Sequence, residues 1–375
     1  KDPLVIRQFD VFNFSERVKQ IVDVTSCLPD SIVVSVVGVG LLVVDGILSQ
    51  SLVSTRSMFA IRITIGSYSC VCAMFVFKRY SAVLCDILGT LGSLAAALEP
   101  LAHPEAQARM RRTAVRSQRV VRFFVFYGAT SQVLVGSLLM FVTPLWTEAL
   151  ARSVLKPITD SDAAVSYLAS TLRFAVLPVT CLLPYVNINA FYCLILCMII
   201  IYNASADLYD AIGRGVENGP CHREWLAVQA GVLKVLLYTD ATIADTMPHL
   251  LVVSVVLPLL STVEVVSYGT KADVFALLMA PLIFTVFVPL CLAGDGLVAA
   301  REGMSTRAWR GPWLEESLRH KKLRLSLMQF TGGRGAQVRG TGIGLLDRPA
   351  CGNALRSWFS FLQVLINVQR QSRAH

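Results

Sequence analysis

Long apolar stretches separated by polar loops dominate the hydrophobic pattern of this chain of 375 residues. Six stretches are clear, namely Ser31–Leu48, Met58–Phe77, Val120–Trp146, Phe174–Tyr202, His249–Tyr268 and Val274–Ala293. At 1.5 Å per residue, each is long enough to cross about 30 Å of hydrocarbon as a helix. A seventh stretch, Cys351 to Val368, is interrupted by polar residues, so hydropathy alone leaves its insertion open. The pattern predicts an all-α membrane protein with seven transmembrane helices.

The basic residues alternate from loop to loop. The N-terminal segment and loops two, four and six carry 24 Lys and Arg, whereas the other loops and the tail carry 7. Because cytoplasmic loops are enriched in Lys and Arg, we expect a cytoplasmic N-terminus and, after seven spans, an extracellular C-terminus. The even loops are long and contain helical patterns such as residues 225–237. We therefore expect the spans to continue as cytoplasmic helical extensions that form an anchor.

Composition agrees with lipid as the solvent and argues against nucleic acid as a partner. Hydrophobic residues make up 54% of the chain and charged residues 16%, with a mean hydropathy of +0.60. Soluble domains carry nearer 25% charged residues. The net charge of +9 arises in the gaps between apolar stretches, where it fixes orientation. Six of the ten cysteines lie inside these stretches, and no spacing indicates a metal or other cofactor.

Catalytic motifs are missing from the sequence. The glycine-rich segments 332–335 and 340–344 lack the Gly-Lys-Ser/Thr ending of a phosphate loop, and the five histidines are scattered. We therefore expect no enzyme. A G-protein-coupled receptor would need an extracellular N-terminus, which would expose the sequon at Asn13, and a transporter usually shows inverted repeats, which we do not find. Asp45 and Arg62 lie within the first two spans, where they either tie two helices together or serve a ligand or an ion.

The last stretch carries a polar stripe at helical spacing. Its members are Asn353, Ser357, Ser360, Val364, Asn367 and Gln371, and they succeed one another by three or four residues. Leu355, Phe359, Leu362 and Ile366 lie opposite, on the side expected to pack. A small polar face with one apolar position suits a water-filled pore that closes by dewetting, and one helix per chain would require several subunits. The alternative is an amphipathic helix that covers polar neighbours in a monomer.

From Leu292 onward the chain resembles the insect odorant receptors. The residues that carry the resemblance are Gly294-Asp295-Gly296-Leu297-Val298, Glu302, Ala308-Trp309, Trp313, the basic run from Arg319 to Gln329 and Phe330, and the terminal Ser360-Phe361-Leu362-Gln363-Val364-Leu365, with His222 before the fifth span. The family's Lys-Pro after the basic run is missing, and Phe361 replaces its tyrosine. The gustatory receptors are the alternative, but their terminal Thr-Tyr…Gln-Phe signature is degraded here to Ser360, Phe361 and Asn367-Val368.

This resemblance implies a ligand-gated, non-selective cation channel of four subunits in the plasma membrane of a sensory dendrite. An odorant-specific subunit would assemble with a shared co-receptor subunit, and each would contribute its seventh helix to one pore. By resemblance the gate is Val364, with Ser360, Asn367 and Val368 beside it. Residues 1–293 would form six helices with a ligand pocket in their outer half, and residues 294–375 the anchor loop and the pore helix.

The same resemblance places a volatile organic odorant among the outer halves of helices two, three, four and six. In this chain those positions offer Phe59, Ile63, Ser67, Met140, Phe141, Cys181, Tyr185, Phe275 and Met279. An apolar, aromatic lining with few polar groups suits such a ligand.

Overall fold

Long helices form almost all of the computed structural model. The structure describes residues 65, 79–80, 82–98, 101–110, 112–113, 115, 119, 126, 130, 148, 151–152, 155, 161–269, 274–332, 339–340 and 344–374, with backbone alone for residues 172–193. The first predicted span lies outside these residues, as do all but residue 65 of the second and all but residues 126 and 130 of the third. Asp45 and Arg62 lie outside them as well.

One described helix, α5, is much longer than a bilayer is thick. Helix α5 (Asp162–Asn218) has 57 residues and is therefore about 85 Å long. It continues past the predicted fourth span into the predicted fourth loop, and α6 (Arg223–Leu251) occupies most of the rest of that loop. Helix α5 thus continues without a break from the predicted fourth span, which ends at Tyr202, to Asn218.

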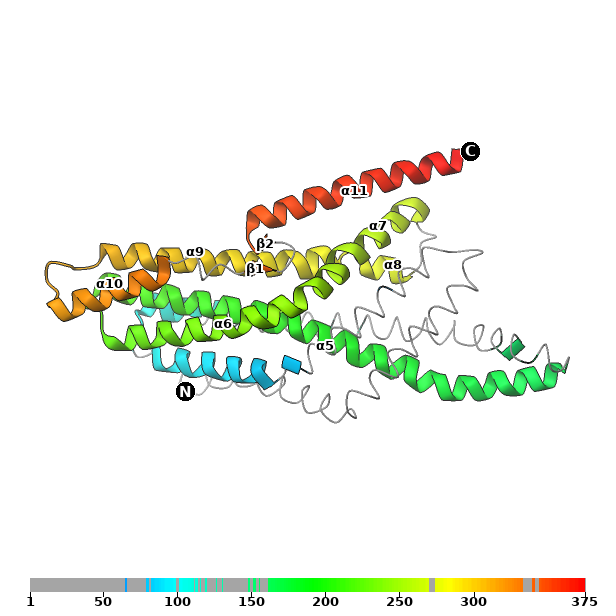
Figure 1. Ribbon diagram of the computed structural model, residues 1–375, viewed down its shortest axis with the longest axis horizontal. Coiled ribbons are helices and arrows are strands. Elements are labelled where there is room, and N and C mark those ends of the chain that lie inside the picture. The colour runs from blue at the N-terminus through cyan, green and yellow to red at the C-terminus, as the bar shows by residue number, and fades with distance from the viewer. Residues whose placement is uncertain are drawn as a thin grey trace.

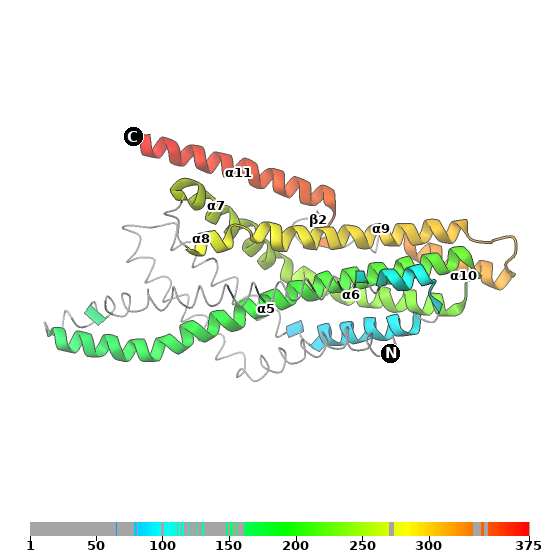
Figure 2. The ribbon, with the colours of Figure 1, turned by 180° about the vertical axis from the view of Figure 1, so that it is seen from behind.

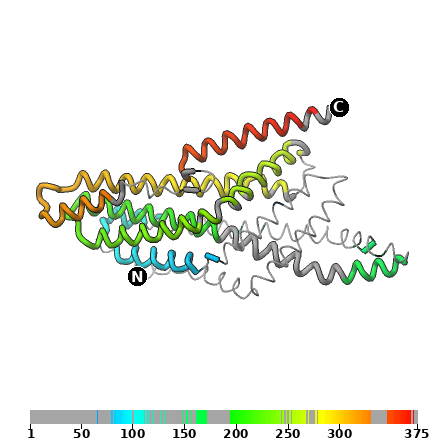
Figure 3. Tube along the Cα trace, viewed as in Figure 1, coloured from blue at the N-terminus to red at the C-terminus, as the bar shows by residue number. Residues whose placement is uncertain are grey.

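At one end of the molecule, called the base here, α5 packs lengthwise against α9 (Val288–Arg310), and both helices end there (Figure 1). From the base α6 runs back along the bundle, and α10 (Leu318–Gly332) folds against α9 and α6 (Figure 3). The shorter helix Ala82–Leu98 joins the same apolar core. In α5, residues 194–199 and 207–213 are all buried, so this part of the helix is enclosed by the core nearly all round.

Two described stretches, Leu194–Asn218 and Ile283–Arg310, are long and apolar enough to cross a membrane. They overlap the predicted fourth and sixth spans. Within the predicted fifth span, Ser254–Val266 is an apolar helix of shorter length. The seventh stretch is helical too, because α11 (Arg348–Ala374) contains all of it. The coarse prediction of an all-helical chain with apolar, span-like helices is confirmed.

Two π-helical segments interrupt the helices of the predicted fifth and sixth spans. η2 (Val252–Val256) joins α6 to α7 (Leu257–Tyr268), and η4 (Ile283–Phe287) joins α8 (Val274–Met279) to α9. A proline follows each segment at the second position of the next helix, Pro258 in α7 and Pro289 in α9. Proline donates no backbone hydrogen bond, which favours such wide turns. The two segments contact each other.

A short hairpin is the one departure from an all-helical fold among the described residues. β1 (Arg339–Gly340) pairs antiparallel with β2 (Gly344–Leu345), with Arg339 opposite Leu345. Its paired residues Gly340 and Gly344 are the ends of the glycine-rich segment 340–344. The proposed division between residues 1–293 and 294–375 falls inside α9, so the two parts share one helix.

Candidate functional site

The terminal helix α11 leans away from the bundle and touches it along one face. It packs against α7 and α9, which lie between α11 and α5 (Figures 1 and 2). The buried residues of α11 are Cys351, Trp358 and Leu362, which share one side of the helix. Leu362, placed on the packing side from sequence, is 9% exposed. Phe359, placed there as well, is 47% exposed, because the buried seam is centred on Trp358 instead.

The polar stripe of α11 faces outward. All six of its members are exposed, including Val364 at 58%. Val364 lies two residues after buried Leu362, which is about 200° around the helix axis, so stripe and seam lie on opposite sides. Exposed Phe361 and Val368 border the stripe on one side. On the other side exposed Arg356 and Gln363 separate the stripe from exposed Phe359.

Trp358 links α11 to both π-helical segments. Its indole Nε1 donates a hydrogen bond of 3.2 Å to the carbonyl of Val255 in η2. Its ring meets that of Phe284 in η4 edge to face, with centroids 6.5 Å apart. A buried tryptophan whose N–H has a partner combines a large apolar contact with a fixed orientation. Movement in either irregular segment would therefore reach α11 directly. Trp358 is not identified from the sequence. The available signal is that Trp358 is the one tryptophan of a largely polar helix.

The first turn of α11 is fixed to the start of α9. A Cβ at Gly294 would lie 2.4 Å from the carbonyl oxygen of Leu346, so only glycine allows this approach. One residue later, Asp295 pairs with Arg348 across 2.8 Å. Asp347 caps the helix by accepting a 2.7 Å hydrogen bond from the backbone N–H of Ala350. The Gly294-Asp295 motif noted from sequence thus has a physical role in seating α11.

At the base, a buried arginine ties together the ends of two helices. The side chain of Arg324 in α10 is 0% exposed. Its guanidinium donates to the carbonyls of Val216 (2.7 Å) and Gly219 (3.0 Å), where α5 ends. It also donates to the carbonyl of Ala308 (3.0 Å) near the end of α9 and to both carboxylate oxygens of Glu316. All five N–H groups of Arg324 are therefore used, and orphan carbonyls of two helix ends are satisfied.

Glu316 remains ionised in this buried pair. Burial on its own would raise the pKa of Glu316, but hydrogen bonds from Arg324 and from the backbone N–H of Cys221 (3.0 Å), together with the charge of Arg324, hold it below the usual value. Because the folded pKa is lowered, the stabilisation is present above the usual pKa of a glutamate and is lost as pH falls through the folded pKa. The pair is therefore fully formed at neutral pH.

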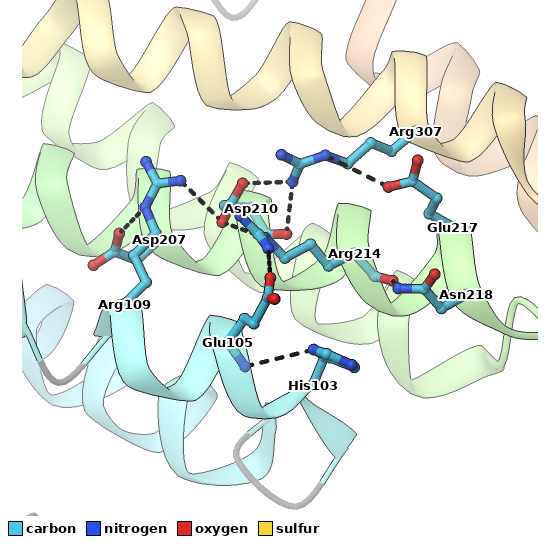
Figure 4. Close-up of polar contacts among 9 residues, drawn as sticks. All are labelled: His103, Glu105, Arg109, Asp207, Asp210, Arg214, Glu217, Asn218 and Arg307. Carbon is cyan, nitrogen blue, oxygen red and sulfur yellow. Dashed lines mark hydrogen bonds and ion pairs between the residues drawn. The ribbon is translucent and has the colours of Figure 1, made fainter.

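A second ion-pair cluster joins loop two to the base (Figure 4). Asp210 in α5 receives Arg109 (3.1 Å), Arg214 (3.1 Å) and Arg307 of α9. Around this centre, Arg109 approaches Asp207, and Arg214 pairs with Glu105 in residues 104–110. The side chain of Asp210 is 6% exposed, so its three partners are needed to compensate the lost hydration. Sequence reasoning missed this cluster, because its members come from three separate segments.

The predicted ligand-binding residues fall mostly outside the described side chains. Phe59, Ile63, Ser67, Met140 and Phe141 lie outside the described residues. Cys181 and Tyr185 are placed by backbone alone within α5, and Phe275 in the same way within α8. Met279 ends α8 and is buried. The structure describes all four residues predicted to line a pore, and each is exposed on α11, namely Ser360, Val364, Asn367 and Val368.

Searches among protein-family models and curated proteins find no match. Solved structures do match. The insect olfactory receptor OR5 from Machilis hrabei aligns with a TM-score of 0.66 at 10% sequence identity, covering 96% of this chain and 100% of that chain. The chain has the fold of the insect olfactory receptors. The same receptor in complex with eugenol aligns with a TM-score of 0.64 at 12% identity, with the same coverage.

The resemblance from Leu292 onward is confirmed at the level of fold, although this receptor shares few residues with the chain. The glycine at 294 and the tryptophan at 358 occupy positions where α9, α11 and the π-helical segments meet in this olfactory receptor fold.

Proposed function

We propose that this chain is an odorant receptor subunit that binds a volatile organic ligand and opens a non-selective cation pore together with a co-receptor subunit. The fold of the insect olfactory receptors supports the proposal, as does the eugenol complex of one neighbour. The protein is then a multi-pass protein of the plasma membrane with its N-terminus and its base in the cytoplasm. The distribution of basic residues supports this orientation.

The outward polar stripe of α11 is the observation that carries the pore assignment. A monomeric protein would turn polar residues of an amphipathic helix to water, but it would not border them with exposed Phe361 and Val368. Around a symmetry axis, those apolar borders meet neighbouring subunits and the stripe faces the axis. Ser360 and Asn367 then line the water, Val364 forms the narrow apolar ring, and Val368 lies at its edge.

Ligand binding is proposed for the outer halves of the helices, on the nine residues named from the resemblance. The π-helical segments offer a route from that region to the pore, because Trp358 of α11 contacts both of them. A ligand that shifts the helix containing α8 and η4 would displace Phe284 and with it the seat of α11.

Co-expression with an insect olfactory co-receptor tests the function directly. In cells whose G-protein signalling is blocked, a panel of volatiles that includes eugenol should evoke a non-selective cation current. The co-receptor expressed alone and cells without either chain are the controls. A response that requires a G protein, or that appears only as second-messenger release, would refute the channel. A current evoked only by non-volatile tastants would favour the gustatory alternative.

A further inference from the structure

A polar groove beside the Asp210 cluster brings three guanidinium groups together. Its volume is about 530 Å³, and it is lined by Glu105, Arg109, Arg112, Thr113 and Arg214. Small-molecule sites in proteins commonly span about 300–1,000 Å³, so the groove is large enough for a compact ligand. Its charged lining is unsuited to an apolar odorant. The groove is therefore a poor site for such an odorant.

The two aspartates of the cluster lie beneath its exposed side chains. The side chains of Asp207 and Asp210 are 10% and 6% exposed, whereas those of Arg109 and Glu105 are 51% and 70% exposed. Arg112 is exposed too. An ion that approaches the groove from solvent therefore reaches Arg109 and Arg112 without passing the aspartates. Among the described residues that line the groove, Glu105 is the one acidic residue, and it is paired with Arg214 across 2.5 Å.

The three arginines keep donors that no described residue of the chain accepts. Arg109 reaches the two aspartates through Nε and Nη1, and Arg214 uses the same two atoms for Asp210 and Glu105. Arg112 gives only its Nε, in a long 3.3 Å bond to the carbonyl of Ala108. Within the described part of the chain, the Nη2 groups of all three arginines have no protein acceptor. Such forked donors match the oxygen geometry of phosphate.

We propose that this groove binds an anion that carries phosphomonoesters, of the size of a phosphorylated inositol headgroup, on Arg109, Arg112 and Arg214. Glu105 competes with that anion for Arg214. The inference rests on the proposed function only for the orientation of the protein in the membrane. That orientation puts residues 78–119 at the cytoplasmic leaflet, where anionic lipids attract basic residues. Bound there, the anion would strengthen the link from loop two to α5 and α9 that Asp210 makes.

Binding is measured on the purified complex of this chain with its co-receptor. One arm titrates soluble inositol 1,4,5-trisphosphate in detergent, and the other compares nanodiscs with and without phosphatidylinositol 4,5-bisphosphate. We expect Arg112→Gln to weaken binding about fivefold, the usual contribution of one basic side chain near an anionic lipid. Glu105→Gln should tighten binding by removing the competitor. Arg310→Gln, an exposed arginine at the end of α9, is the matched control and should change nothing.

The outcomes separate the possible sources of the anion from failure of the idea. If only the soluble headgroup binds, the anion is a free phosphate ester, and if only the lipid binds, the anion is a lipid headgroup of the membrane. In both cases Arg112→Gln must weaken the binding. Absence of binding in both arms overturns the proposal, as does an equal effect of Arg112→Gln and Arg310→Gln. Because the assay needs no odorant, loss of odorant current with intact phosphate binding would count against the channel alone.

Discussion

Replacing Arg324 with methionine should remove the folded receptor from the cell surface. The change leaves Glu316 charged and buried without its partner and frees three carbonyls at the ends of α5 and α9. Breaking a buried ion pair in this way costs about 3–5 kcal/mol, a large part of the about 5–15 kcal/mol that stabilises a typical domain. Surface biotinylation and the unfolding temperature in detergent measure the effect.

Two companion variants make the Arg324 prediction specific. Arg324→Lys should fail as well, because an ammonium group has three donors where five are used. Gly311→Ala should mimic it, since a Cβ there would lie 1.8 Å from Nη1 of Arg324. Arg319→Met, at an exposed position of the same helix, serves as the control. Normal surface expression of Arg324→Met would show that the base is not held by this contact.

Replacing Val364 with serine should raise the current measured without odorant. A ring of valines keeps a narrow bore dry, and a hydroxyl at each position would wet it. Burying a valine side chain contributes more than about 1.4 kcal/mol. If the substitution destabilises the closed state by that amount, the ratio of open to closed channels rises about tenfold. Whole-cell recording of basal current, normalised to surface expression, measures it.

Leu362→Ser is the matched control for the gate, because Leu362 faces the opposite side of α11. It is 9% exposed, so the substitution should reduce the amount of folded channel by about 2–5 kcal/mol of lost stability without changing permeation. The reverse pattern, in which Val364→Ser leaves basal current unchanged and Leu362→Ser alters ion selectivity, would mean that α11 is rotated from the orientation proposed here.

The sequence predicted the features that depend on local pattern. Helices lie where the apolar runs predicted the fourth to sixth spans. The three- and four-residue spacing of Asn353 to Gln371 identified the exposed face of α11. The pattern placed Phe359 on the wrong side, because the position of the seam is decided by Trp358 and its partners in η2 and η4. Amphipathic spacing gives the existence of a buried face more reliably than its centre.

The base could not be predicted because its contacts join distant segments. Arg324 bonds to Val216 and Gly219, more than 100 residues earlier, and Asp210 collects arginines from three segments. In the sequence these arginines are distinguishable only as part of the excess of basic residues that predicts the orientation of the protein in the membrane. Gly294 belongs to a motif visible in the sequence. The need for glycine there comes from the close approach of Leu346, which depends on the packing of α9 against the segment before α11.

Ion selectivity of Asn367→Asp is the most direct measurement of whether this chain lines the pore. A negative ring beside the gate should favour divalent cations, so raising extracellular calcium should shift the reversal potential of the odorant-evoked current to more positive values than in the unmodified channel. Gln329→Glu adds the same charge at an exposed position of α10, away from α11, and should leave the reversal potential unchanged. An unchanged reversal potential in Asn367→Asp, with normal surface expression and odorant response, would contradict the account.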